Sequence, residues 1–147
     1  MSREDIRSDL NQLLADYMVF YQKLRNYHWN VRGQEFFKLH EKFEEGYLQA
    51  ADWVDDIAER VLALGGTPYS TLRQQTEHAR LGEDPEAPSA HQMVRNLIDD
   101  IEQLNEWSQD VAEVAEEARD RPTANLLDDI MDMQAERKWM FETFLQD

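Results

Sequence analysis

The chain has no cysteine among its 147 residues, which excludes disulfides, thiol catalysis and thiolate metal sites. Its 5 glycines and 4 prolines are few and clustered, so long helices can run between the clusters. No apolar run approaches the ~18 residues that a membrane-spanning helix needs, and the first residues lack the apolar core of a signal peptide. We therefore predict a cytoplasmic protein with no membrane segment.

Positive charge is also scarce, because 31 Asp and Glu residues stand against 15 Lys and Arg residues and leave a net charge of -16. A surface of this sign repels phosphates, which argues against direct binding to nucleic acid or to an anionic membrane. The first ten residues offer only Arg3 and Arg7 among acidic neighbours. We predict no tight DNA binding, while bridging by divalent cations, and through it an association with the nucleoid, stays open.

Four segments carry the three- and four-residue apolar spacing of amphipathic helices, and no segment reads as a strand. They run from about Arg3 to Arg32, from Glu35 to Leu64, from Ser89 through Ala115, and from Pro122 almost to Asp147. Two capping boxes are expected at helix starts, Ser2 with Asp5 and Ser89 with Gln92. The length suits a single domain over residues 1–147.

The connection between the second and third helices, residues 65–88, is roughly 24 residues long and contains a candidate short helix at Thr71–His78. Extended chain of this length can span a bundle ~40 Å tall. The short joints at Gly33 and Pro122 instead force antiparallel neighbours. Two hairpins joined by one long crossover predict an all-α, ferritin-like four-helix bundle. The alternative is an ordinary up-and-down bundle with a floppy loop.

The second helix places four polar side chains on one arc at ~100° per residue: His40, Glu44, Asp55 and Glu59. This arc lies beside the expected apolar stripe of Phe36, Phe43, Tyr47, Val54 and Val61. Imidazole and carboxylate groups are ligands for iron and similar cations. The competing interpretation is an exposed face of salt bridges. The Glu-x-x-His pairs of a di-iron site inside one bundle are absent.

These four residues cannot serve one ion within one straight helix, because Glu44 and Asp55 are ~16 Å apart at ~1.5 Å per residue. An antiparallel copy, packed about a twofold axis near Gln49 and Ala50, would bring His40 and Glu44 opposite the copy's Asp55 and Glu59. We expect Gly46, Ala50 and Ala51 to permit this close approach. A twofold contact is self-complementary, so two equivalent shared metal sites follow.

His28 belongs with this set by position, because it lies at the end of the first helix, which a tight turn folds onto the start of the second. The alternative is a core histidine that is hydrogen-bonded to a backbone carbonyl.

Several spaced motifs in one order resemble the Dps family of mini-ferritins. They are His28-Trp29-Asn30-Val31-Arg32-Gly33, Phe36-Phe37-Lys38-Leu39-His40-Glu41-Lys42-Phe43, Asp55-Asp56-Ile57-Ala58-Glu59-Arg60 and Ala63-Leu64-Gly65-Gly66, with Trp139-Met140-Phe141 matching more loosely. The resemblance implies a hollow homo-dodecamer. It also implies oxidation of Fe(II), typically by hydrogen peroxide, and storage of ferric mineral inside the shell.

The same resemblance implies a ferroxidase site made of His28, His40 and Glu44 of one chain with Asp55 and Glu59 of its twofold mate. The family commonly has Asp where this chain has Glu44. Three further roles are carried over as expectations. Trp29 is a candidate electron relay, Glu41 and Glu45 are candidates for mineral nucleation, and acidic residues near the start of the last helix are candidate pore residues: Glu116, Glu117, Asp120, Asp128 and Asp129. Asn125 replaces an acidic residue often found at that pore.

Three functions stay open at this point. The chain could form a shell that oxidises and stores iron, with iron or zinc at the same site. It could instead be a nucleoid-associated structural protein that protects DNA with little catalytic role, or a shell occupied by zinc. Zinc would bind the same imidazole and carboxylate ligands, since affinity alone does not select iron.

Overall fold

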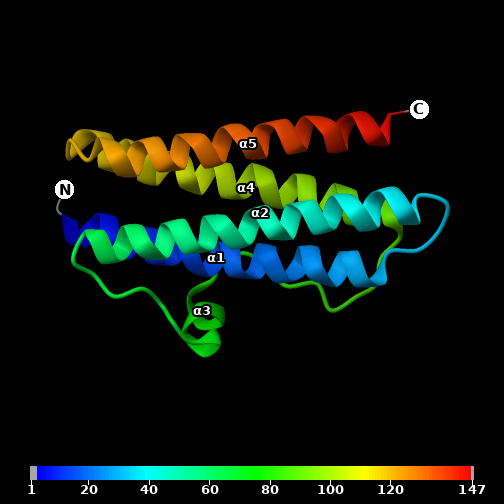
Figure 1. Ribbon diagram of the computed structural model, residues 1–147, viewed down its shortest axis with the longest axis horizontal. Coiled ribbons are helices and arrows are strands. Elements are labelled where there is room, and N and C mark those ends of the chain that lie inside the picture. The colour runs from blue at the N-terminus through cyan, green and yellow to red at the C-terminus, as the bar shows by residue number, and fades with distance from the viewer. Residues whose placement is uncertain (1–2, 147) are drawn as a thin grey trace.

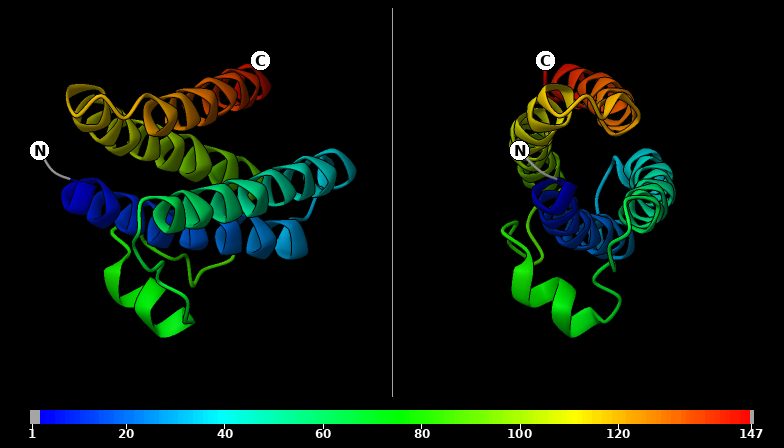
Figure 2. Two further views of the ribbon diagram at one scale, coloured as in Figure 1. Left: turned by 60° about the vertical axis from the view of Figure 1, so that its left-hand side comes forward. Right: turned by 90° about the vertical axis from the view of Figure 1, so that its left-hand side faces the viewer.

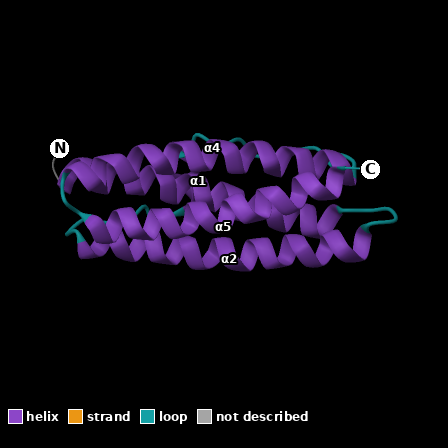
Figure 3. Ribbon diagram, turned by 90° about the horizontal axis from the view of Figure 1, so that it is seen from above, coloured by secondary structure: helices purple, strands orange, loops and turns teal. Residues whose placement is uncertain are grey.

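The computed structural model describes the backbone of residues 3–146 and the side chains of residues 6–146. Four long helices, α1 (Arg3–Asn30), α2 (Phe36–Ala63), α4 (Ala90–Glu117) and α5 (Arg121–Leu145), lie side by side, and the short α3 (Leu72–His78) lies outside them. Within the described residues there is no strand. The all-helical fold predicted from the apolar spacing is confirmed (Figure 1, Figure 3).

Helices α1 and α2 form one antiparallel hairpin, and α4 and α5 form the other. The crossover from α2 to α4 runs the length of the bundle, so α2 and α4 point the same way (Figure 1). It passes along α1 and carries α3 on the outside of the bundle (Figure 2). The long crossover with a short helix inside it, which distinguishes the ferritin-like bundle from the up-and-down alternative, is therefore present.

The helix boundaries follow local capping chemistry. Helix α1 ends at Asn30, two residues before the predicted end, and Gly33 takes the left-handed φ of +105° in the turn that follows. Thr71 caps α3 in a full capping box with Gln74. At α4 only half of the predicted box forms, because the Gln92 side chain donates to Asn96 instead. The predicted Ser2–Asp5 box lies outside the described residues.

The core-facing side of α2 differs from the predicted stripe by roughly 50° around the helix at ~100° per residue. Phe43 and Val61 are buried as expected, but Phe36, Tyr47 and Val54 are only partly buried. The buried face comprises Leu39, Phe43, Gly46, Ala50, Trp53, Ile57 and Val61. The stripe was misplaced because it counted large apolar residues, whereas α1 packs closely against small ones.

Gly46 and Ala50 are therefore used inside the subunit, and the prediction that they line a twofold contact is wrong. A Cβ at position 46 would meet Leu24 of α1 at 3.1 Å, and Ala50 has no exposed surface. Ala51 is partly exposed. Close packing between α1 and α2 requires the small residues at positions 46 and 50.

The crossover is fastened to α1 by side-chain hydrogen bonds. Arg7 donates to the carbonyl of Leu64 at 2.9 Å, and Asn11 pairs with the backbone of Thr67 and of Tyr69. Further along, the fully buried Asp16 carboxylate holds the segment after α3, and Asn26 donates to the carbonyl of Asp84. Over the described residues, none of the helices is long and apolar enough to cross a membrane.

Candidate metal centre

Two histidines meet where the turn after α1 folds back onto the start of α2. The rings of His28 and His40 stack with their centroids 3.7 Å apart and their planes within 13°. Nδ1 of His28 lies 2.6 Å from the carbonyl oxygen of His40, and Nδ1 of His40 lies 2.7 Å from the carbonyl oxygen of His28. A carbonyl oxygen only accepts, so in both rings Nδ1 carries the proton and donates it. In the neutral form of each ring, Nε2 therefore keeps its lone pair for a ligand.

Side chains on α2 hold these rings in place. Phe36 stacks on His40 with ring centroids 4.9 Å apart, and Tyr47 packs edge-on against His28 at 5.3 Å. His28 is only 6% exposed and is bonded to a backbone carbonyl, as the alternative description predicted, and its role as a metal ligand stays a prediction.

Glu44 lies one turn after His40 on α2. Its Oε1 is 3.6 Å from His28 Nε2, and its side chain is about half exposed. Two imidazoles and one carboxylate thus lie in one region of a single chain, with a mixed nitrogen and oxygen character that suits iron or zinc, although their three ligand atoms do not all lie within 4.8 Å of one another. Because three protein groups do not fill a coordination sphere, further ligands must come from solvent, a substrate or another chain.

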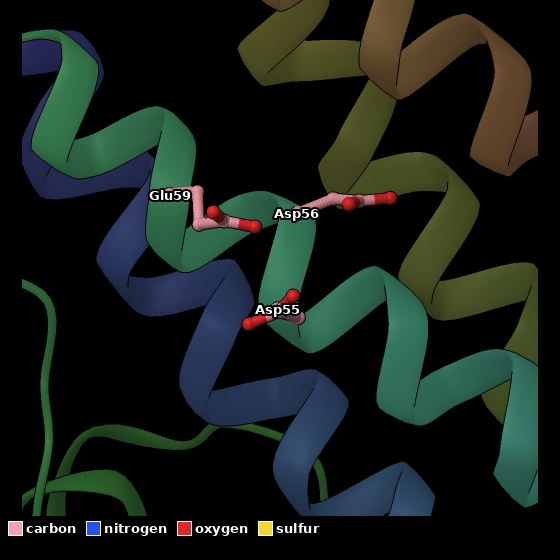
Figure 4. A group of neighbouring side chains, drawn as sticks. All are labelled: Asp55, Asp56 and Glu59. Atoms are coloured by element: carbon pink, nitrogen blue, oxygen red, sulfur yellow. The ribbon is translucent and has the colours of Figure 1, made fainter.

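Three carboxylates form a second group at the other end of α2 (Figure 4). Asp55, Asp56 and Glu59 each offer an oxygen within 4.8 Å of the other two. The negative charge of Asp55 is the main cause that raises the pKa of Glu59, and burial, followed by the charges of Asp55 and Asp52, raises the pKa of Asp56. A bound cation would relieve this repulsion.

Asp56 was not predicted. The ~100° rotation between neighbouring residues places it off the arc that Asp55 and Glu59 share, but one of its oxygens still lies within 4.8 Å of an oxygen of each. The adjacent Asp55 and Asp56 in the sequence were the available signal.

The chain brings His28, His40 and Glu44 together, and it brings Asp55 and Glu59 together, but it does not bring the two groups to each other. Apart from His28, which lies on α1, their members lie on the single continuous helix α2, where Glu44 and Asp55 are ~16 Å apart along the axis. Their meeting between two chains stays a prediction.

The remaining predicted residues lie around the histidine pair without contributing a ligand atom to it. Trp29 is 56% exposed, and the guanidinium of Arg25 lies 5.0 Å from its ring centroid. Glu41 and Glu45 are exposed, Glu45 pairs with Lys42 at 3.1 Å, and both line a cleft between α2 and α5.

Among the candidate pore acids, Asp120 has a structural task. It caps α5 by accepting from the Thr123 N–H, and it also accepts from the Thr123 hydroxyl at 2.6 Å and from Arg60 at 3.2 Å. Because the Arg60 guanidinium and the Thr123 hydroxyl already occupy its largely covered carboxylate, Asp120 is a poor pore residue. The other four predicted pore residues are exposed: Glu116, Glu117, Asp128 and Asp129. Asn125 is exposed as well.

Comparison with known proteins gives consistent results. The sequence profile of the ferritin-like domain matches residues 8–147. A DNA protection during starvation protein of Brevibacillus brevis is 43% identical over 137 residues, which cover 93% of this chain and 92% of that protein. General stress protein 20U of Bacillus subtilis is 38% identical over 142 residues, covering 97% of this chain and 98% of that protein.

Solved structures extend the match to three dimensions. A Dps protein from Bacillus brevis superposes with a TM-score of 0.96 at 40% identity, covering 99% of this chain and 100% of that chain. Dps from Vibrio cholerae, described as a member of a broad superfamily of ferritin-like diiron-carboxylate proteins, superposes with a TM-score of 0.95 at 34% identity, covering 98% and 91%. Sequence, fold and spacing agree, and the chain therefore belongs to the Dps family of ferritin-like proteins.

Proposed function

We propose that this chain oxidises Fe(II) and stores the ferric product inside a homo-dodecameric shell in the cytoplasm. The observation that carries the proposal is the reciprocally bonded pair His28 and His40, whose rings stack and in which His28 Nε2 lies 3.6 Å from Glu44 Oε1. The diiron-carboxylate description of the Vibrio cholerae relative supports the same chemistry.

The centre is completed by a second chain. With α2 helices of two chains antiparallel, the Asp55 and Glu59 carboxylates of one reach the His28, His40 and Glu44 group of the other. The exposed leucines of α2 support this contact, because Leu48 and Leu62 are 56% and 58% exposed on the same arc as the ligands. An apolar surface beside ligating groups is expected to be covered by another chain.

In this reaction the main role of the protein is to hold the substrate ions. Neutral imidazoles and carboxylates bind Fe(II) and leave coordination positions for the oxidant. With hydrogen peroxide the balance is 2 Fe²⁺ + H₂O₂ + 2 H⁺ → 2 Fe³⁺ + 2 H₂O. Because both electrons enter one peroxide, no hydroxyl radical is released. Glu41 and Glu45, exposed on α2, then offer carboxylates for mineral nucleation, and the exposed Trp29 ring is placed to pass on an electron.

The test is an anaerobic Fe(II) titration followed by hydrogen peroxide, with ferric absorbance as the readout. We expect about two Fe(II) oxidised per peroxide, as a two-electron oxidant requires, and a product that stays soluble. His40→Ala should slow oxidation at least ~10-fold, because even substitutions outside the ligand sphere cost ~10–100-fold at metal sites.

The matched control is His91→Ala, which removes an exposed histidine of α4. Equal rates in the His40 variant and the wild type would overturn the proposal. A shell that binds zinc but oxidises no Fe(II) would favour the zinc alternative, for which the zinc-soaked Dps structure from Listeria innocua is a precedent.

The names of several relatives refer to DNA protection, and we infer that this chain protects DNA by consuming Fe(II) and peroxide rather than by coating it. With a net charge of -16 per chain, the assembled shell repels phosphates. In a gel shift at neutral pH and moderate salt, with chelator present, we expect no retardation of duplex DNA at submicromolar protein. Retardation under these conditions would show direct binding, and retardation only with added Mg²⁺ would show cation bridging.

A further inference from the structure

The centre of the bundle contains a polar cluster that the metal centre does not use. Tyr17 of α1, Ser108 of α4 and Gln134 of α5 have no exposed surface. The Gln134 side-chain amide donates to the Tyr17 hydroxyl oxygen at 3.4 Å. The Trp53 ring of α2 packs edge-on against the Tyr17 ring, with centroids 5.7 Å apart, so all four long helices enclose the cluster.

The hydrogen-bonding groups of this cluster are only partly used. In the described part of the chain, Gln134 Oε1 and Ser108 Oγ are buried without a hydrogen-bond partner. The Tyr17 oxygen accepts from Gln134, which leaves the Tyr17 proton to be donated. Burial raises the pKa of Tyr17, and the neighbouring Gln134 and Ser108 side chains oppose the rise. The cluster therefore offers a donor, an acceptor and a hydroxyl that can act as either.

This incomplete bonding is concentrated in one region of the bundle. Of the five buried side-chain atoms without a partner in the described residues, four belong to α4 and α5: Asn105 Oδ1, Ser108 Oγ, Gln134 Oε1 and Arg137 Nε. Buried polar groups in native proteins are almost always paired, and ordered water is the usual partner when the protein supplies none.

We propose that Tyr17, Ser108 and Gln134 bind one buried water molecule at the centre of the bundle. The water accepts from the Tyr17 O–H, donates to Gln134 Oε1 and shares its third hydrogen bond with the Ser108 hydroxyl. Three partners match the number that buried waters usually have. The phenol stays protonated, and hence a donor, across the physiological pH range.

The donor set selects water over a metal ion. A phenol, a hydroxyl and an amide are neutral, whereas metal sites in the cores of ferritin-like bundles use glutamate and histidine. The nearest buried carboxylate in sequence, Asp16, is committed to Arg80 and Leu81 of the crossover. Iron oxidation at α2 and water binding at the bundle centre are thus independent, and either one can fail without the other.

A high-resolution crystal structure of the intact protein tests the proposal, with a second crystal soaked in zinc. We expect a density peak within hydrogen-bond distance of Tyr17 Oη, Ser108 Oγ and Gln134 Oε1, without anomalous signal in the soaked crystal. The double variant Ser108→Ala with Gln134→Met should lose the peak, because it removes two of the three partners while keeping the volume similar. Gln109→Met, at an exposed position of α4, should retain it.

Wild-type crystals without the peak, or with zinc at the same place, would overturn the proposal, and so would a peak that survives in the double variant. Iron oxidation by the double variant should equal that of the wild type. This second measurement separates the two proposals. If the proposed iron oxidation is wrong, the wild type itself will fail to oxidise Fe(II), whereas an error in the water proposal affects only the electron density.

Discussion

Shells assembled from two inactive variants should recover about a quarter of the wild-type rate of iron oxidation, because a shared centre draws its ligands from both chains of a twofold pair. One variant, His28→Ala with His40→Ala, lacks the imidazoles. The other, Asp55→Ala with Glu59→Ala, lacks the carboxylates. In a pair made of one chain of each, one centre receives no intact ligand group and the other receives both.

The recovered fraction follows from counting. In a random one-to-one mixture about half of the twofold pairs contain one chain of each kind, and about half of the centres in those pairs are complete. Co-expression with two different tags and sequential purification isolates the mixed shells. Each pure variant should be at least ~10-fold slower than the wild type under the same conditions.

A second mixture of variants tests whether mixing alone restores iron oxidation without completing a centre. When the histidine variant is combined with Glu44→Ala, both lesions lie in the same half of the centre, so no pair can contain a complete site. This mixture should stay as slow as its parents. If the first mixture also stayed slow, the centre would not be shared between chains. If the second mixture recovered, the gain would come from the mixing itself.

Much of the fold could be predicted because it is encoded over short spans of sequence. The start of α3 follows from Thr71 and Gln74, and the stops of α1 and α2 follow from glycines that adopt positive φ, Gly33 and Gly65. The length of the crossover, together with the short joints at Gly33 and Pro122, favoured the ferritin-like topology over the up-and-down alternative. Each of these signals acts within a few residues, or depends only on how many residues separate two helices.

The rotation of α2 could not be predicted in the same way, because it depends on which residues of α1 it meets. Leu24 fills the space above Gly46, so the small residues of α2 face the core. Periodicity identifies an amphipathic helix, but large side chains such as Phe36 and Tyr47 can sit at the edge of the buried face.

The sequence predicts a set of candidate ligand residues, but not the hydrogen bonds that orient the two histidine rings. The ring nitrogens of His28 and His40 are set by each other's backbone carbonyls, and these bonds exist only because the turn after α1 brings two helices together. Likewise, the partners Asp16 and Arg80 are 64 positions apart and carry no shared motif. Long-range polar contacts of this kind appear only once the fold is known.

Asp16→Ala should be the most destabilising single substitution on the crossover side of the bundle. The Asp16 carboxylate is fully buried and accepts four hydrogen bonds, from the backbone N–H groups of Arg80 and Leu81 at 2.5 and 3.0 Å and from the Arg80 guanidinium at 2.7 and 3.0 Å. The guanidinium in turn lies 4.0 Å from the Trp107 ring centroid, so Asp16 indirectly links α1 to α4.

Removing Asp16 leaves the backbone N–H groups of Arg80 and Leu81 without their acceptor, at about 1–3 kcal/mol for each donor left unsatisfied. The Arg80 side chain is 33% exposed, so water can solvate its charge. We expect the free energy of unfolding to fall by about 2–6 kcal/mol and the melting temperature to drop by roughly 4–24 °C, at about 2–4 °C per kcal/mol. Asp16→Asn keeps an acceptor for the amides and should lose less, whereas Asp132→Ala, exposed on α5, should change little.

Hydrogen exchange of the Arg80 and Leu81 amides separates a local effect from a global one. If Asp16 holds the crossover, these amides should exchange faster in Asp16→Ala by about as much as the loss of stability requires, which is at least ~100-fold for ~3 kcal/mol. Helix α3 and the segment after it should also become sensitive to protease while the four long helices stay protected. Unchanged exchange at both amides would mean that the crossover is held by Arg7, Asn11 and Asn26 without help from the buried carboxylate.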